Sequence, residues 1–374
     1  MTDAIRPFRI EVPQADLDDL HNRLANARWP QELPGVGWTR GIPLDHLKEL
    51  AQRWRVGYDW RSHESTLNGF PQYTTTIDGQ RIHFIHARSD RPDAKPLLIT
   101  HGFPSSVAEF LHLIEPLVSP AKGQAFHVVA PSLPGYAFSN PLGSTGWTMA
   151  RTARAWVELM RRLGYQRYGV HGGDVGAGVS GAVAGIDGEH VIGLHVVTDP
   201  WTAAATATFI PGMADGLDAD SPVDALILER MKAFKTDGSG YLMIQNSRPQ
   251  TIGYGLADSP VLQLAWIAEK VHEWTELPVD VDQILTTVSL YWFTGSGCSA
   301  AHTLYDQAHS SDWGAPATVP QGVAVFGADE TVRRVVPAPA DVHWTEFTRG
   351  RHFPAMEAPD DLAADLREFF GPLA

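Results

Sequence analysis

One acidic residue stands at the centre of a run of small residues. The pentapeptide 172–176, Gly-Gly-Asp-Val-Gly, follows the short apolar run 168–170 and precedes a further stretch of small residues. Small residues two positions before and after a central side chain are what a sharp turn from strand to helix requires, because the neighbouring chain passes too close for a Cβ atom. The pattern therefore predicts a nucleophile elbow with Asp174 at its apex.

A carboxylate at this apex indicates attack on a saturated carbon. The central residue of such a turn is usually Ser, but no Gly-x-Ser-x-Gly occurs in this sequence. A serine that opened an alkyl electrophile would leave an ether that water cannot cleave, whereas Asp174 leaves an ester whose carbonyl can be hydrolysed. The glycine-rich match by itself fits an ordinary loop equally well, so the interpretation depends on the rest of the chain.

A histidine occurs where the general base of such a nucleophile is expected. His352 lies in a glycine-containing loop directly after the last predicted strand, and the chain order of nucleophile, acid and base fits it. We interpret His101 as a neighbour of the loop 101–104, whose role is described below, and His171 as a neighbour of the elbow. His352 is therefore the predicted base.

Three acids could orient this base. Asp329 and Glu330 both follow the predicted strand near 322–326, which is the last strand but one before His352. We favour Asp329, because the first acid after the strand end points back towards the edge of the sheet, and we interpret Glu330 as a solvated surface charge. Asp199, after an earlier strand, is the third candidate, since some enzymes with this arrangement take their acid from that position.

Backbone N–H groups must stabilise the anion that forms when water attacks the ester. The segment 101–104, His-Gly-Phe-Pro, follows the predicted strand 97–100, and Val175 follows the nucleophile. The backbone N–H groups of Phe103 and Val175 can together form a two-donor oxyanion hole. Neither side chain takes part in this role.

Short apolar runs alternate with helical patterns around these residues. After a hairpin over 73–87, we expect strands at 97–100, 126–130, 168–170, 191–197, 322–326 and 341–347, and helices at 107–117, 148–163 and 360–370. Strands that alternate with helices form a mostly parallel sheet with helices on both faces. The predicted fold class is therefore α/β.

The chain divides into four predicted segments. Residues 1–70 form a helical meander rich in aromatic residues that anchor it to the main domain, and residues 71–199 form the first part of the α/β core. Residues 200–317 include helical patterns at 261–274 and 279–292, and residues 318–374 complete the core. An insertion of this size at the carboxyl edge of the sheet would cover the site as a lid.

Composition limits the classes of partner. The formal net charge of −14 over 374 residues argues against nucleic acid and favours a small, neutral or apolar partner. The single cysteine, Cys298, excludes an intrachain disulfide, and the Cys/His spacing of a zinc site is absent, so we expect no metal and no cofactor. No signal peptide or run of about 18 apolar residues occurs, which favours a soluble, cytoplasmic protein without a membrane anchor.

Several motifs together point to one family. They are the meander segment 29–60, His-Gly-Phe-Pro at 101–104, Pro-Ser-Leu-Pro-Gly-Tyr-Ala-Phe-Ser at 131–139, the elbow at 172–176, and Arg-Gly-Arg-His-Phe at 349–353 followed by Glu357-x-Pro359. On these motifs the sequence resembles the epoxide hydrolases of the α/β-hydrolase superfamily, in particular the microsomal type with an N-terminal meander. The resemblance implies an α/β-hydrolase fold and conversion of an epoxide and water into a vicinal diol through an ester on Asp174.

The resemblance also implies two lid tyrosines that hold the epoxide oxygen, and Tyr241 and Tyr305 match their positions. The sequence departs from the family pattern at three places, since Phe103 and Val175 stand where Trp is usual and Arg351 replaces the commoner Gly. Smaller side chains beside the nucleophile widen the pocket, which favours a bulky epoxide of the kind met in secondary metabolism or detoxification.

Two other functions are compatible with parts of the pattern. A haloalkane or haloacid dehalogenase shares the Asp nucleophile and His base, but it needs a halide donor, commonly a Trp after the nucleophile, which Val175 does not supply. A non-catalytic ligand-binding protein of this fold would have no need for buried Asp174, His352 and Asp329 together. The meander or the lid could form a homodimer, although no sequence feature establishes one.

Overall fold

A nine-stranded sheet forms the centre of the computed structural model, which describes residues 4–210, 212–336 and 340–374. The strands are β1 (Arg6–Phe8), β2 (Gln72–Ile77), β3 (Gln80–Ala87), β4 (Lys95–Thr100), β5 (Phe126–Pro131), β6 (Tyr168–Gly172), β7 (Val191–Thr198), β8 (Gln321–Val325) and β9 (His343–Glu346). Their order across the sheet is β1-β2-β3-β5-β4-β6-β7-β8-β9. The first three strands and β5 pair antiparallel, and every pair from β5–β4 to β8–β9 is parallel.

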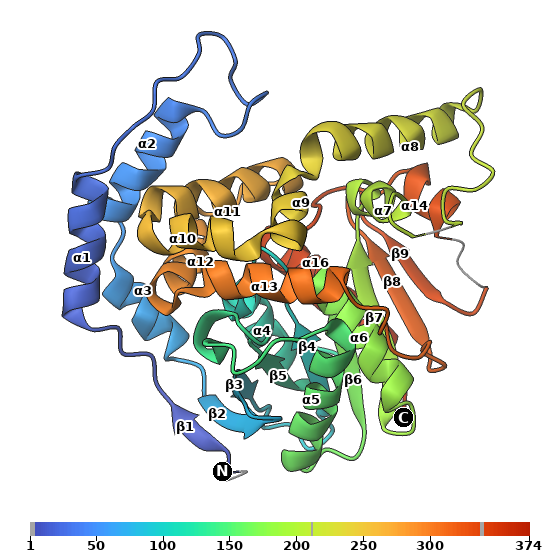
Figure 1. Cartoon of the computed structure of the whole chain (residues 1–374). Coiled ribbons are helices and arrows are strands. Elements are labelled where there is room, and N and C mark those ends of the chain that lie inside the picture. Colours follow the sequence, from blue (N-terminus) through green and yellow to red (C-terminus); the bar gives the residue numbers. More distant parts are fainter. Residues whose placement is uncertain (1–3, 211, 337–339) are drawn as a thin grey trace.

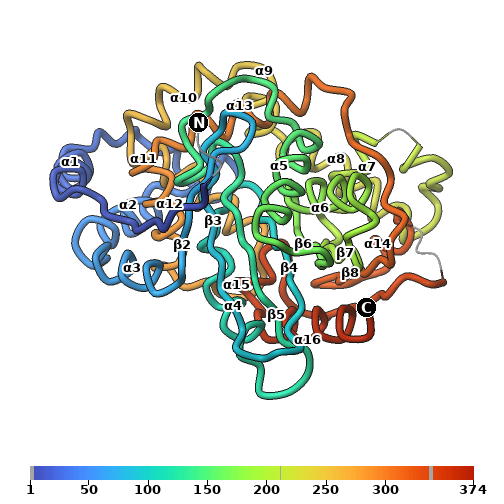
Figure 2. The backbone as a smooth tube through the Cα atoms, turned by 90° about the horizontal axis from the view of Figure 1, so that it is seen from below, coloured from blue at the N-terminus to red at the C-terminus, as the bar shows by residue number. Residues whose placement is uncertain are grey.

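Helices cover both faces of this sheet. The helices of the meander and core are α1 (Gln14–Ala25), α2 (Leu44–Gln52), η1 (Arg53–Gly57), α3 (Trp60–Leu67), η2 (Val107–Phe110), α4 (Leu111–Val118), η3 (Ala137–Ser139), α5 (Met149–Arg162), α6 (Val175–Ile186), α14 (Glu330–Val335), α15 (Pro354–Glu357) and α16 (Pro359–Phe370). Helices α4 and α16 lie on one side of the strands, and α5 and α6 lie on the other (Figure 2). The predicted α/β-hydrolase arrangement is confirmed.

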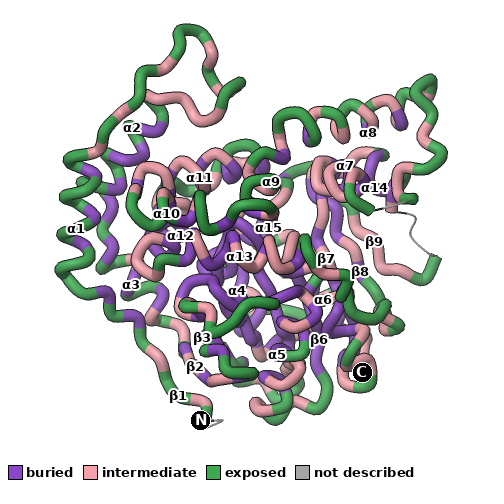
Figure 3. Tube along the Cα trace, in the orientation of Figure 1, coloured by how far each residue is buried: buried purple, intermediate pink, exposed green. Residues whose placement is uncertain are grey.

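The strands of the parallel part are buried on both faces. Along β4, Leu97 and Ile99 pack with the residues of α4 and α16, while Leu98 between them packs into the opposite cluster. Alternate side chains point to opposite faces of a strand, so a strand covered on both sides carries a nearly continuous apolar run. Figure 3 shows this buried centre beneath an exposed outer layer.

The segment between β7 and β8 is helical throughout most of its length. It contains α7 (Pro200–Ala207), α8 (Pro222–Ala233), η4 (Phe234–Gly238), α9 (Gly240–Ser247), α10 (Pro249–Asp258), α11 (Pro260–Trp274), α12 (Val281–Thr294) and α13 (Ser296–Ala308). Helices α9 to α13 lie across one end of the sheet in Figure 1. This arrangement is that of a lid over the carboxyl ends of the parallel strands.

The meander is fastened to the lid. The indole N–H of Trp54 donates to Ser289 Oγ at 2.9 Å, and Arg53 pairs with Asp282 at 2.7 Å; both partners lie on α12. Helices α1 and α2 also contact α11 (Figure 1). Trp54 and Arg53 therefore hold the meander against α12. Within the described ranges no helix is both long and apolar enough to cross a bilayer.

Candidate active site

Asp174 occupies a strained turn between β6 and α6. Its backbone has φ 52° and ψ −128°, a left-handed conformation that side-chain-bearing residues rarely adopt. A Cβ atom on Gly172 would collide with the carbonyl oxygen of Gly176, and one on Gly176 would collide with that of Thr100 on β4. Only glycine fits these two positions, so the sequence pattern and the sharp turn have the same steric cause.

The carboxylate of Asp174 rests on the loop that follows β4. The backbone N–H of Phe103 donates to Asp174 Oδ1 at 2.8 Å. Gly102 lies so close to the Asp174 side chain that a Cβ would displace it. The loop thus presents a backbone donor to one carboxylate oxygen, as an oxyanion hole requires. The matching role of the Val175 N–H, at the first turn of α6, stays a prediction.

His352 faces the other carboxylate oxygen. Its Nε2 lies 3.7 Å from Asp174 Oδ2, and the side chains of His352 and Asp174 are 9% and 28% exposed. The backbone N–H of His352 donates to the carbonyl of Trp274 on the lid helix α11 at 3.1 Å, and the two rings pack 4.9 Å apart. Among the described residues Nε2 has no hydrogen-bond partner, so it is available to accept a proton from water.

Asp199 is the acid that lies against His352. Its Oδ2 is 3.5 Å from His352 Nδ1, and its side chain is 3% exposed. Thr202 links the pair, because its hydroxyl lies 3.0 Å from Nδ1 and donates to Asp199 Oδ2. Burial alone would lower the pKa of His352, but hydrogen bonding to Asp199 and the negative charge of Asp174 raise it overall. Asp199 thereby stabilises the protonated ring.

Asp329, the acid favoured in the sequence as the partner of the base, has other partners in this structure. Asp329 accepts the backbone N–H of Thr331 at 2.8 Å as the N-cap of α14, and it pairs with Arg230 on α8 at 2.7 Å. Glu330 is exposed, as expected of a surface charge. The acid after β8 is turned towards the lid helix α8, whereas Asp199 caps α7 beside the loop of His352.

His101 and His171, which were given no catalytic role in the sequence analysis, both have structural partners. His101 Nε2 lies 3.2 Å from the backbone nitrogen of Leu133, which donates to it, and His171 Nδ1 lies 3.0 Å from Nδ1 of His195. Both are buried. Neither contact involves the nucleophile, so these rings hold loops and strands together.

Sequence reasoning missed two polar residues beside the site. Thr202 sits in a run of small residues on α7, where nothing in the sequence distinguishes it. Glu109 is buried in η2, and burial raises the pKa of its carboxyl to about 7, with the nearby charge of His352 acting against the shift and that of Asp174 adding to it. A lone acid in the apolar segment Val107–Phe110 was the signal that could have revealed it.

Tyr241 comes from the lid to the neighbourhood of the nucleophile. Its ring stacks on Phe103 with centroids 5.7 Å apart and an interplanar angle of 2°. Burial, and then the negative charge of Asp174, raise the pKa of Tyr241. The phenol therefore remains protonated and can donate a hydrogen bond over the oxyanion loop.

Tyr305, predicted as the second lid tyrosine of the site, is not among the described residues that line the cavity of Asp174. Its ring stacks on His309 with centroids 4.0 Å apart. The preceding residue of α13, Leu304, lines the cavity that contains Asp174 instead. One residue of an α-helix corresponds to a rotation of roughly 100°, so the register of α13 decides which side chain faces the nucleophile.

Two cavities meet at Tyr241. The first has a volume of ≈ 710 Å³, contains Asp174 and Val175, and has a mainly apolar wall. The side chains of that wall include Ala203, Phe209, Met213, Leu242, Leu304 and Trp313. The second has a volume of ≈ 890 Å³ and a more polar wall that includes Asp199, Asp237, Lys270 and Arg351. Tyr241 is the lining residue that both share within the described parts of the chain.

Family models match two overlapping parts of the chain. The model described as epoxide hydrolase N terminus matches residues 5–110, and the model described as alpha/beta hydrolase fold matches residues 95–222.

Full-length relatives agree with these matches. Epoxide hydrolase 1 of Sus scrofa is 33% identical, with coverage of 99% of this chain and 89% of its own. A Stigmatella aurantiaca protein whose name assigns it to the epoxide hydrolases is 43% identical, over 99% of this chain and 85% of its own. The solved structure of Aspergillus niger epoxide hydrolase has a TM-score of 0.83 at 31% identity and covers 99% of this chain and 97% of its own.

Proposed function

The chain belongs to the epoxide hydrolase family and is an enzyme of that kind, and we propose that its reaction runs through a covalent ester on Asp174 with a large, mainly apolar epoxide as substrate. One observation carries the proposal. The two oxygens of Asp174 have separate partners at the wall of an apolar cavity, the Phe103 N–H at 2.8 Å and His352 Nε2 at 3.7 Å.

In the first half-reaction Asp174 attacks a ring carbon of the epoxide. Oδ1 is engaged by the Phe103 N–H, so Oδ2 is the oxygen available to form the new bond. The epoxide oxygen leaves as an alkoxide, a poor leaving group that needs a proton donor already in place. The Tyr241 hydroxyl, on the lid above Phe103, supplies one such donor.

In the second half-reaction water attacks the ester carbonyl. The carbonyl oxygen is then Oδ1, so negative charge develops on the atom that already accepts from Phe103. His352 takes the proton of this water through Nε2, and Asp199 stabilises the imidazolium through Nδ1 and Thr202. The same residues return that proton to the diol oxygen as the ester is cleaved.

The size and lining of the cavity support a bulky substrate. A volume of ≈ 710 Å³ lies within the range of pockets that enclose drug-sized molecules. Val175 follows the nucleophile directly and leaves the wall open where a Trp would fill it. An epoxide with a large hydrocarbon or aromatic skeleton fits this description better than a small one.

Isotope labelling tests the covalent step. In a single turnover with enzyme in excess and ¹⁸O-labelled water, the first diol should contain an unlabelled oxygen from Asp174, and the peptide containing Asp174 should gain the label. The Asp174→Asn variant is the control and should form no ester. A labelled first diol together with an unlabelled peptide would mean that water attacks the epoxide directly, and the proposed mechanism would be wrong.

A further inference from the structure

A buried lysine of the lid lies against the ring of Tyr241. Lys270 belongs to α11, and 5% of its surface is exposed. Its ammonium nitrogen lies over the Tyr241 ring, 5.2 Å from the ring centre, and 5.9 Å from the ring centre of Trp274. A cation at such a distance is attracted by the negative face of an aromatic ring. Lys270 therefore helps to hold the ring of the lid donor in place.

Two carboxylates fix the ammonium group in this position. Lys270 Nζ lies 2.8 Å from Glu269 Oε1 and 2.7 Å from Glu273 Oε2. A Cβ atom on Gly41 would lie 2.9 Å from Glu269 Oε2, so the meander closes over this carboxylate. A buried ion pair is often no more stable than apolar side chains of similar volume, so stability alone does not account for the lysine.

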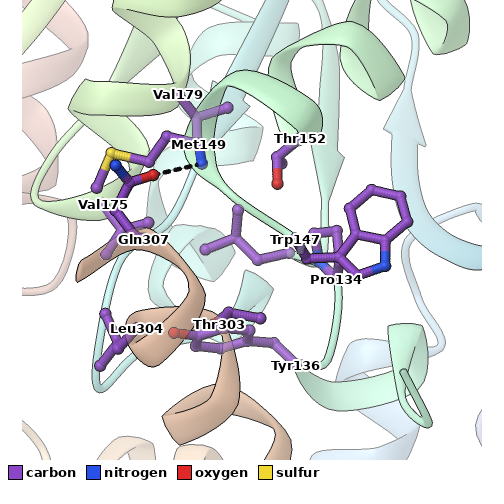
Figure 4. A pocket seen from close by; sticks show the side chains of 11 residues that line it. Pro134, Tyr136, Trp147, Met149, Thr152, Val175, Val179, Thr303, Leu304 and Gln307 are labelled. Atoms are coloured by element: carbon purple, nitrogen blue, oxygen red, sulfur yellow. Dashed lines mark hydrogen bonds between the residues drawn. The ribbon is translucent and has the colours of Figure 1, made fainter. Parts of the chain in front are cut away.

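No cation lines the substrate cavity in the part of the chain that the structure describes. Asp174 is the one charged residue of its described wall. Leu304 and Gln307 of α13, which form part of that wall, are shown in Figure 4. Lys270 lines the second, more polar cavity, which shares Tyr241 with the substrate cavity. The positive charge of Lys270 therefore reaches the reacting oxygen through Tyr241.

We propose that Lys270 is a positioning residue for Tyr241, because it orients the phenol and stabilises the negative charge that develops on it as the epoxide opens. The proposal rests on the proposed function, in which Tyr241 donates to the epoxide oxygen. Negative charge on a phenolate spreads into its ring, so an ammonium over the ring binds the phenolate more tightly than the phenol. Burial, and after it the negative charges of Asp174 and Glu273, raise the pKa of Tyr241. The ammonium group offsets part of this cost during proton transfer.

The proton balance of the step is closed. As Asp174 Oδ2 bonds to a ring carbon, the electron pair of the breaking C–O bond passes to the epoxide oxygen, which takes the proton of Tyr241. The phenolate that remains lies next to the Lys270 ammonium. Hydrolysis of the ester regenerates Asp174 as a carboxylic acid, and the proton of that acid returns to the phenolate. Lys270 neither gains nor loses a proton in the cycle.

The split between the two half-reactions tests this role. Lys270→Met nearly keeps the length of the side chain and removes its charge, and we expect it to slow ester formation about 30-fold in rapid-quench measurements. Hydrolysis of the ester should stay within about threefold of the wild type. Lys270→Arg keeps the charge and should restore most of the rate. Helix α11 provides an internal control, because Trp274 packs on His352 at 4.9 Å and a distorted helix would slow hydrolysis as well.

Glu273 gives a test of opposite sign. Glu273→Gln removes a negative charge that opposes the phenolate and leaves Glu269 to hold the ammonium. Ester formation in this variant should be no slower than in the wild type. If the two glutamates and Lys270 served only as a scaffold, both Lys270→Met and Glu273→Gln would slow this step.

Two results for Lys270→Met would overturn the role of the lysine. One is ester formation at the wild-type rate, and the other is an equal loss in both half-reactions. If Lys270→Met does not fold, the Glu273→Gln enzyme still decides, because slower ester formation in it contradicts the electrostatic role. A failure of the proposed function is recognised separately, since the wild type would then form no ester on Asp174, or Tyr241→Phe would form it at the full rate.

Discussion

Replacing Asp199 by asparagine is expected to stall hydrolysis of the ester while its formation continues. The imidazolium that forms during hydrolysis lies 3.5 Å from Asp199 Oδ2. At an effective dielectric constant of about 20, two unit charges at this distance attract by roughly 5 kcal/mol. Loss of that attraction corresponds to about 10³-fold in the hydrolysis rate. Thr202 still holds Nδ1, so the ring should keep its position.

Rapid-quench mass spectrometry provides the assay. The Asp199→Asn enzyme should accumulate one ester per active site in a burst, followed by turnover about 10³-fold slower than in the wild type. The matched control is Asp329→Asn, which removes a partner of Arg230 and should leave hydrolysis within about threefold of the wild type. An Asp329→Asn enzyme that accumulates ester, with Asp199→Asn turning over normally, would refute the orientation of His352 described above.

Three further variants test other parts of the site. Tyr241→Phe should slow ester formation by about 10²–10³-fold in stopped-flow measurements, with hydrolysis unaffected; a wild-type rate would exclude the lid donor. Val175→Trp should lower kcat/KM for aryl or polycyclic epoxides and spare small ones, and an equal loss on all substrates would argue against the wide cavity. The carboxyl of Glu109 has a folded-state pKa of about 7 against an ordinary 4.5, so the folded state holds its proton more tightly and stability falls as pH rises through this window. Glu109→Gln should remove that decline. In urea unfolding, the free energy of unfolding of the variant relative to the wild type should therefore be higher at pH 7.5 than at pH 4.5 by roughly 3 kcal/mol, and parallel pH profiles for the two proteins would contradict this expectation.

The strands of the parallel sheet were predictable because a strand that is buried on both faces consists of a nearly continuous run of apolar residues. The run 97–100 is found within β4, and 168–170 within β6. The short edge strand Arg6–Phe8 could not be recognised in the same way, because three residues with a central Pro carry neither alternation nor an apolar run. Its existence depends on pairing with β2 across more than sixty residues of chain.

The site was predictable where local geometry restricts the residue type. The elbow needs glycine at positions 172 and 176, two residues before and after its strained apex, so Asp174 could be identified from the sequence alone. The choice between Asp329 and Asp199 depends on which loop comes to His352 in space, and chain order does not determine it. Which of Tyr305 and Leu304 lines the cavity of Asp174 depends on the rotation of α13 by one residue, which only three-dimensional packing reveals.

The cavities that meet at Tyr241 have a practical consequence for directed evolution. Side chains such as Met213 and Trp313 line only the apolar cavity, and Asp237 and Arg351 line only the polar one. Mutations at positions without shared partners usually combine additively. Libraries on the two walls can therefore be selected separately and the winners joined in one gene, provided that Tyr241 is kept.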